Sequence, residues 1–225
     1  MMEGMEPTPP NRAAPSTASH DLAHAIRLEA LTLAWMVAEA TLALWAGIAA
    51  GSVLLVAFGA DSIIELASAV VLMARLLGQW RGRLDEAGIE RAEARAGRIA
   101  GALLYLLAAY VVIESGLALW QREAAGESWL GMAVTGAAAL GMPVLARAKL
   151  RVAARIGSGA LRADAMETLT CGYLSWAVLA GLAANRLLGW WWLDAAAALA
   201  IVPILVKEGR EALSGGCSCC HGEEA

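Results

Sequence analysis

The sequence predicts an all-α, polytopic membrane protein with six transmembrane helices and both termini in the cytoplasm. Three observations support this fold class: the chain is strongly apolar, its apolar residues come in long blocks, and its arginines gather in alternate connections. Of the 225 residues, 59% are hydrophobic, whereas a soluble domain is about 45–50% apolar. Because a helix needs about 20 apolar residues to cross a bilayer, blocks of this length predict membrane spans.

Six blocks are long enough to cross a membrane. We expect them near residues 28–50, 53–75, 98–120, 128–147, 164–187 and 190–207. The fifth is the least hydrophobic at its start, and the sixth is short. Glycine and alanine are abundant and the chain has only one phenylalanine, so the spans are expected to pack through small residues.

Arginine and tryptophan predict how the spans are oriented. Two connections are basic: the one between the second and third spans carries Arg81, Arg83, Arg91, Arg95 and Arg98, and the one between the fourth and fifth carries Arg147, Lys149, Arg151, Arg155 and Arg162. The opposite connections carry only Arg122 and Arg186. Since cytoplasmic loops carry an excess of Lys and Arg, we expect both basic connections and both termini in the cytoplasm. Tryptophans fall at the predicted outer ends, as an interfacial belt would.

The two ends of the chain are expected to lie outside the membrane domain. Residues 1–24 are rich in Pro, Ser and Thr and lack the pattern of a cleaved signal, so we expect a disordered cytoplasmic leader. Residues 25–212 are expected to form the six-helix domain. Residues 213–225 hold a Cys- and His-rich sequence, CSCCH, which favours a reduced, metal-binding cytoplasmic tail.

Charge and motifs exclude several classes of function. The net charge is −4 and gives no basic surface for nucleic acid, so we expect membrane lipid and not nucleic acid as a partner. The sequence shows no nucleophile–base pair, phosphate-binding loop or cofactor motif. We therefore expect neither an enzyme nor a tightly bound cofactor.

Two acidic residues lie within the second predicted span. Asp61 and Glu65 are four positions apart, so they share one helix face and lie about 6 Å apart along its axis. A charged side chain at the membrane centre costs about 3 kcal/mol or more. Two carboxylates this close also repel each other, so the pair favours a bound cation or a shared proton. The alternative is structural: each carboxylate hydrogen-bonds a neighbouring Ser or Thr.

The fifth predicted span offers a second pair at the same spacing, Glu167 and Cys171. Counted from Arg75 and Arg162 at the cytoplasmic boundary, Glu65 lies roughly 15 Å deep and Cys171 roughly 13–14 Å deep. The two pairs can therefore share one layer. Oxygen and sulfur ligands from two helices would close a four-ligand site, and such a site suits a divalent transition metal such as Zn²⁺. Cys171 alone has the alternative of being a small buried apolar residue.

Other acidic residues in the spans have less defined roles. We expect a structural or proton-linked role for Glu39, and Glu114 stays unassigned. Asp164 and Asp194 lie near span ends, where helix capping or an interaction with the helix dipole is expected.

Together these motifs resemble the cation diffusion facilitator family, whose members are six-span metal exporters with both termini in the cytoplasm. The stretch GADSIIEL is similar to the family's G-x-D-S-x-x-D pattern in the second span, with Asp61 and Glu65 at its metal positions. The stretch RADAMETLTC is similar to R-A-D-x-x-H/D-x-x-x-D in the fifth span, with Glu167 and Cys171 at its ligand positions. The stretch WWWLDAAAALAI is similar to W-x-D-x-x-x-A in the sixth span, with Asp194 at the Asp position.

The resemblance covers roughly residues 25–212 and implies proton-coupled efflux of a divalent transition metal across the cytoplasmic (plasma or inner) membrane. The ligand set Asp, Glu, Glu, Cys differs from the family's usual mixture of Asp and His. We expect Zn²⁺, with Cd²⁺, Co²⁺, Fe²⁺ and Mn²⁺ as alternatives. Most members carry a cytoplasmic domain after the sixth span that helps them dimerise. We expect this chain to lack that domain, and a homodimer is a further expectation. The alternative function is a membrane protein that binds or senses metal without transporting it.

Overall fold

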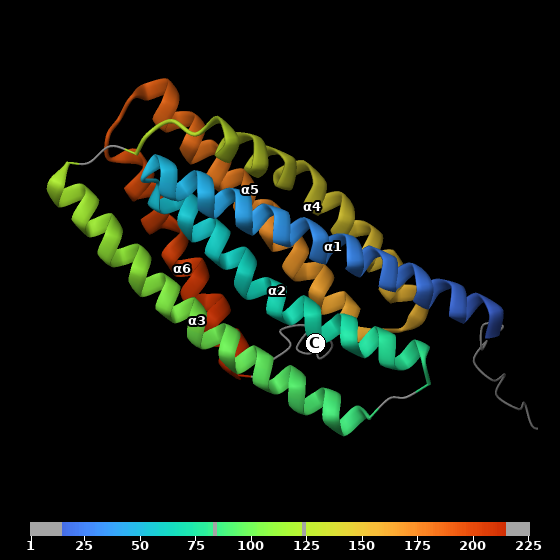
Figure 1. Cartoon of the computed structure of the whole chain (residues 1–225). Coiled ribbons are helices and arrows are strands. Elements are labelled where there is room, and N and C mark those ends of the chain that lie inside the picture. The colour runs from blue at the N-terminus through green and yellow to red at the C-terminus, as the bar shows by residue number, and fades with distance from the viewer. Residues whose placement is uncertain (1–14, 83–84, 123–124, 215–225) are drawn as a thin grey trace, which may run out of the picture.

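The computed structural model describes residues 15–82, 85–122 and 125–214. Within these ranges the chain forms six α-helices and no strand. The helices are α1 (Pro15–Ala50), α2 (Val53–Trp80), α3 (Glu86–Gln121), α4 (Trp129–Ile156), α5 (Gly159–Leu188) and α6 (Leu193–Ser214). They run side by side as one elongated bundle (Figure 1). The all-α fold class is therefore confirmed.

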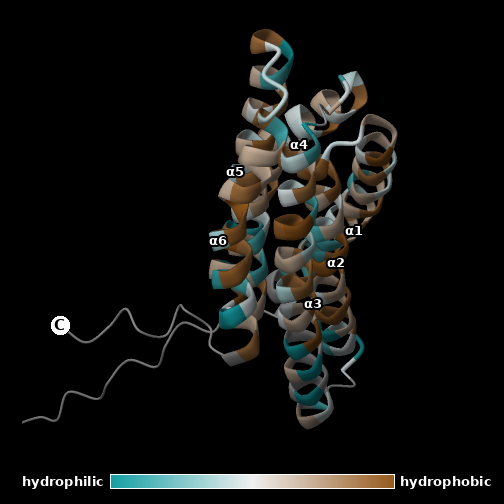
Figure 2. Cartoon of the chain, turned by 90° about the vertical axis from the view of Figure 1, so that its left-hand side faces the viewer, coloured by the Kyte–Doolittle hydropathy of each residue, from teal (hydrophilic) through white to brown (hydrophobic). Residues whose placement is uncertain are grey.

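Four of these helices are long and apolar enough to cross a membrane over His20–Ala50, Val53–Trp80, Arg98–Gln121 and Trp129–Ile156. The described parts of α5 and α6 fall short of that level of hydropathy. Both carry acidic residues that are buried in the bundle, Asp164 on α5 and Asp194 on α6. Hydrophilic residues gather at the lower end of α3, beyond its apolar middle (Figure 2). The chain is thus a multi-pass membrane protein.

The first helix begins earlier than the sequence suggests. The leader was expected to be disordered as far as residue 24, but α1 begins at Pro15. Proline is pre-organised for the first turn of a helix, since its missing N–H is not needed there. Leu22 and Ala25 are then buried against Leu72 and Leu76 of α2, in a second, smaller apolar core. This packing stabilises the start of α1 as a helix, although its composition alone predicts disorder. Residues 1–14 and 215–225, including the cysteines of the predicted tail, lie outside the described residues.

The bundle consists of a four-helix group and a helix pair. Helix α1 packs against α2 and α4, α4 packs against α5, and α2 also contacts α5. Helices α3 and α6 pack on each other and lie beside α2 (Figure 1). At one end of the bundle, the lower right in Figure 1, α1 begins, α2 leads to α3, and α4 leads to α5. The two basic connections therefore share one end of the molecule.

Small residues bring α3 and α6 close together, as the composition predicts. A Cβ atom added to Gly101 would lie 2.7 Å from the carbonyl oxygen of Gly209, and a Cβ atom on Gly209 would lie 3.2 Å from the oxygen of Gly101. Only glycine allows the two backbones to approach this closely. Helices in membranes associate through such small-residue contacts, because lipid supplies no hydrophobic drive to bring them together.

At the opposite end of the bundle, Asp194 joins the start of α6 to the start of α2. Its Oδ1 accepts a hydrogen bond of 2.6 Å from the Ser52 hydroxyl, and its Oδ2 accepts one of 3.3 Å from the Leu54 N–H. Ser52 is the N-cap of α2, and its Oγ accepts a hydrogen bond from the Leu55 N–H at 3.1 Å. Asp194 therefore caps a helix, as expected, but the capped helix is α2 and not its own.

Replacing Asp194 by alanine is expected to lower the free energy of unfolding by about 1–3 kcal/mol, because a buried hydroxyl and a buried N–H lose their acceptor. Unfolding of the purified protein by denaturant in detergent micelles measures this loss. Asp194→Asn keeps one carbonyl acceptor and is expected to lose less stability. Equal stability of the wild type and both variants would contradict a structural role for this contact.

Candidate metal site

A small cavity lies within the four-helix group formed by α1, α2, α4 and α5. Its volume is about 10 Å³, which is close to the space that one buried water requires. The lining comes from all four helices: Thr32 and Met36 from α1, Glu65 and Ala69 from α2, Met142 from α4, and Asp164, Glu167, Thr168 and Cys171 from α5. Three of the four predicted metal ligands, Glu65, Glu167 and Cys171, thus line the same cavity.

The three lining residues differ in how deeply they are buried. Cys171 is 2% exposed, Glu65 is half-buried, and Glu167 is exposed at the rim. Glu167 and Cys171 are one helical turn apart, so they share one face of α5. Helix α2 runs antiparallel to α5 and brings Glu65 opposite them. The equal depth that the sequence predicts for Glu65 and Cys171 therefore agrees with their shared cavity.

Asp61, the fourth predicted ligand, does not line this cavity. It lies one turn from Glu65 on α2 and is 3% exposed. Its Oδ1 atom has no hydrogen-bond partner among the described residues. Buried carboxylate oxygens are normally hydrogen-bonded, so an orphaned one calls for an explanation such as an ion.

The predicted ligands do not form a complete coordination shell in this structure. Among the described residues, no three His, Cys, Asp or Glu side chains are placed so that they could hold one metal ion. Side chains or helices would have to move by a small amount to close a shell around an ion. The assignment of Asp61, Glu65, Glu167 and Cys171 as ligands stays a prediction.

Glu39 of α1 is held against this group by three hydrogen bonds. Its Oε1 accepts one of 2.7 Å from the Ser62 hydroxyl and lies 3.7 Å from the Cys171 Sγ, which donates to it. Its Oε2 accepts one of 2.5 Å from the Trp35 indole N–H. The side chain is 2% exposed. The sequence could not reveal that Glu39 reaches Cys171, because the contact spans 132 positions.

A buried ion-pair triad, which the sequence did not predict, lies beside the cavity. The Lys149 Nζ of α4 lies 2.8 Å from the Glu29 Oε2 of α1 and 2.5 Å from the Asp164 Oδ2 of α5. It also donates to the Thr168 hydroxyl at 3.4 Å. Lys149 and Glu29 are fully buried. Lys149 lies within α4, so its expected place in a connection is wrong, and Ser158, not Asp164, is the N-cap of α5. The expected interaction of Asp164 with the helix dipole stays a prediction.

One signal in the sequence could have identified Lys149. Ala146, Val152 and Ala153 are apolar and lie three or four positions from Lys149, so they share its helix face. All three are buried in the structure. A lysine on an apolar helix face requires a buried anionic partner. Since Asp164 and Thr168 also line the cavity, the Lys149 ammonium group lies next to the predicted metal site.

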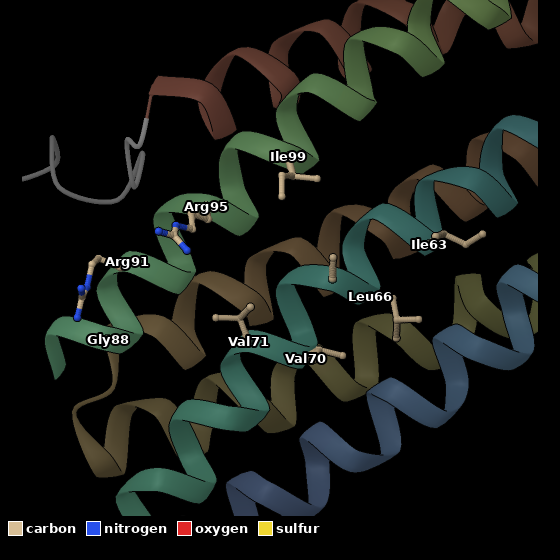
Figure 3. Close-up of a pocket in the computed structure, with 9 residues that line it drawn as sticks. Ile63, Leu66, Val70, Val71, Gly88, Arg91, Arg95 and Ile99 are labelled. Atoms are coloured by element: carbon tan, nitrogen blue, oxygen red, sulfur yellow. The ribbon is translucent and has the colours of Figure 1, made fainter. Parts of the chain in front are cut away.

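A larger hollow of the described structure does not suit a cation. It has a volume of about 700 Å³ and lies between α2 and α3, with apolar side chains such as Leu66 and Val70 on its walls. Arg91 and Arg95 project from α3 beside it (Figure 3). Two guanidinium groups repel a divalent cation. Glu114 lines a separate hollow together with Asp194 and does not line the cavity of Glu65.

Comparison with known proteins places the chain in a family. No curated protein matched the sequence. The family model of the cation efflux transmembrane domain matches residues 30–216, which cover nearly all of the six-helix bundle. The chain therefore belongs to the cation efflux family and is a multi-pass membrane transporter of metal cations.

Proposed function

We propose that the chain exports a divalent transition-metal ion, Zn²⁺ in the first place, in exchange for protons. The proposed site consists of Asp61, Glu65, Glu167 and Cys171. The observation that carries the proposal is the small cavity that Glu65 of α2 lines together with Glu167 and Cys171 of α5. Carboxylate oxygens and a thiolate are ligands that Zn²⁺ accepts in tetrahedral geometry. The thiolate further favours Zn²⁺ or Cd²⁺ over Mn²⁺ or Mg²⁺.

Proton coupling follows from the chemistry of these ligands. A thiol or a carboxylic acid binds metal only after it loses its proton, so metal binding releases protons. Protons that enter from the opposite side restore the acids and expel the ion. Metal and protons then compete for one set of side chains, and this competition is an antiport. Helices that rock around a site near the bilayer midplane would open it to each side in turn.

We further propose that the two basic connections and both termini face the cytoplasm, in a plasma or inner membrane. Both basic connections lie at the end of the bundle where α1 begins (Figure 1), and Lys and Arg concentrate on the cytoplasmic side of membrane proteins. The protein acts in this proposal as a transporter and not as an enzyme. It uses no tightly bound cofactor, and it works as a homodimer.

Transport by purified protein in proteoliposomes tests this function. We expect uptake of Zn²⁺ that a pH gradient accelerates, with Cd²⁺, Co²⁺, Fe²⁺ and Mn²⁺ assayed in parallel. A protein that senses or stores metal would bind these ions to the outside of the vesicle without moving them inside. Binding without uptake would therefore replace the transporter by that alternative.

Replacing Cys171 by aspartate is expected to shift ion preference away from Cd²⁺ and toward Mn²⁺. The change exchanges a soft sulfur ligand for a hard oxygen ligand, and Mn²⁺ prefers oxygen. The variant should also depend more steeply on pH, because one more carboxylate joins a cluster that already shares protons. The measurement is the ratio of Cd²⁺ to Mn²⁺ transport in vesicles.

Cys171→Ser and Cys171→Ala are the matched variants for this experiment. Both remove the thiolate without adding a carboxylate, so both should lose Cd²⁺ transport without gaining Mn²⁺ transport. An unchanged ratio in all three variants would remove Cys171 from the site. Asp61, Glu65 and Glu167 would then hold the ion together with water.

A further inference from the structure

Cys171 lies between carboxyl groups from two helices. Its Sγ lies 3.7 Å from the Glu39 Oε1 of α1, and it lines the same small cavity as Glu65 of α2. Both Glu39 and Cys171 are at least 98% buried. The thiol therefore has a second acidic neighbour, Glu39, that the two sequence motifs do not include.

We propose that Glu39 is a metal ligand, so that the ion is held by three helices, α1, α2 and α5. The inference rests on the proposed function, since it adds Glu39 to the site proposed there. It also gives α1 a direct part in ion binding.

The distance between Glu39 and Cys171 fits two ligands of one ion. Zinc binds oxygen at about 2.0 Å and sulfur at about 2.3 Å, so two such ligands in a tetrahedral shell lie roughly 3.5 Å apart. The observed separation of Oε1 and Sγ is 3.7 Å. An ion could therefore replace the thiol proton between these two atoms with very little movement of either helix.

The other contacts of Glu39 resemble those of a metal-binding carboxylate that neighbouring hydrogen-bond donors hold in a fixed orientation. Ser62 donates to Oε1 at 2.7 Å and Trp35 donates to Oε2 at 2.5 Å. Outer hydrogen-bond donors of this kind hold a ligating carboxylate in place and tune its binding. Ser62 directly follows Asp61, so the serine of the GADS stretch positions Glu39 beside the predicted ligands of α2.

The orphaned oxygen of Asp61 gives independent support. Asp61 is 97% buried, and its Oδ1 has no hydrogen-bond partner among the described residues. Asp61 directly precedes Ser62, whose hydroxyl donates to the Glu39 Oε1 at 2.7 Å, so the two acidic residues lie where α1 and α2 contact each other. A buried carboxylate with an unpartnered oxygen, one helical turn from Glu65 and next to the serine that binds Glu39, favours a nearby cation when it is ionised.

Metal binding to the purified full-length protein tests the inference. Cys217, Cys219 and Cys220 are first replaced by serine, so that Cys171 is the only cysteine of the chain. Titration with Co²⁺ then reports sulfur ligation through the thiolate-to-cobalt absorption band. We expect Glu39→Gln to weaken Co²⁺ binding by more than about 100-fold, because loss of a group that only supports a ligand costs about 10- to 100-fold. Glu114→Gln, the matched change of another intramembrane glutamate, should leave binding unchanged.

Glutamine keeps one carbonyl oxygen that can accept from the Ser62 hydroxyl, whereas its amide NH₂ group cannot accept from the Trp35 indole N–H. It also lacks the negative charge of a carboxylate ligand. Wild-type Co²⁺ affinity and an unaltered spectrum in folded Glu39→Gln would therefore overturn the inference. Glu39→Cys supplies a gain of signal. If position 39 reaches the ion, X-ray absorption of bound Zn²⁺ should count two sulfur ligands in place of one. A count of one would exclude Glu39 from the shell.

The same titrations separate this inference from the proposed function. If Asp61, Glu65 and Cys171 variants lose Co²⁺ binding while both Glu39 variants behave as wild type, only the inference about Glu39 fails. If the protein with its tail cysteines replaced binds no Co²⁺ and transports no metal, the proposed site itself fails.

Discussion

Replacing Asp61 or Glu65 by alanine is expected to abolish metal transport while the protein stays folded in the membrane. Each variant removes a carboxylate that the ion needs. It also removes the cost of burying that charge, so stability should not collapse. For Asp61 the structure gives a further reason, because its Oδ1 makes no hydrogen bond within the described residues that alanine would lose. The measurements are Zn²⁺ uptake into proteoliposomes and the elution profile of each variant in detergent.

Glu114→Gln is the control for these two variants. Glu114 also lies within a membrane span, on α3, but it does not line the cavity. We expect it to transport at the wild-type rate, which would show that losing an intramembrane carboxylate is not harmful in itself. Wild-type transport by both Asp61→Ala and Glu65→Ala would instead make the pair structural and remove the centre of the proposed site.

Replacing Lys149 by methionine is expected to destabilise the protein by about 3–5 kcal/mol. Methionine fills a similar volume but leaves the carboxylates of Glu29 and Asp164 buried without their cation, and breaking a buried ion pair from one side has this cost. Both partners lie within 2.8 Å of the ammonium group. Denaturant unfolding in detergent micelles measures the loss. A normal midpoint for Lys149→Met would contradict the triad.

Two further variants make the result specific to the triad. The triple change Lys149→Met, Glu29→Gln and Asp164→Asn removes all three charges, so it should recover most of the stability that Lys149→Met loses. Lys207→Met removes a lysine that is 76% exposed and lies 3.9 Å from Glu211. An exposed pair of this kind contributes little, so Lys207→Met should unfold as the wild type does.

The fold class and the family follow from the amino-acid sequence alone. Apolar blocks about 20 residues long predict membrane helices in any context, because the bilayer requires each span to satisfy its own backbone hydrogen bonds. The spacing of four between Asp61 and Glu65, and between Glu167 and Cys171, places each pair on one helix face whatever the packing. The resemblance to a metal-exporting family rested on these short motifs, and the family match over residues 30–216 confirms it.

The contacts among the remaining polar residues depend on how the helices pack, and local sequence patterns do not report them. Lys149, Glu29 and Asp164 come from three helices, and the sequence placed Lys149 in a connection because positive residues near a span end normally face water. Glu39 and Cys171 are 132 positions apart, and Ser52 and Asp194 are 142 apart. Local patterns report the face of a helix on which a residue lies, but not the neighbouring helix that the face meets. That choice depends on how all six helices pack, since a buried charge is stable only beside the partner that packing brings to it.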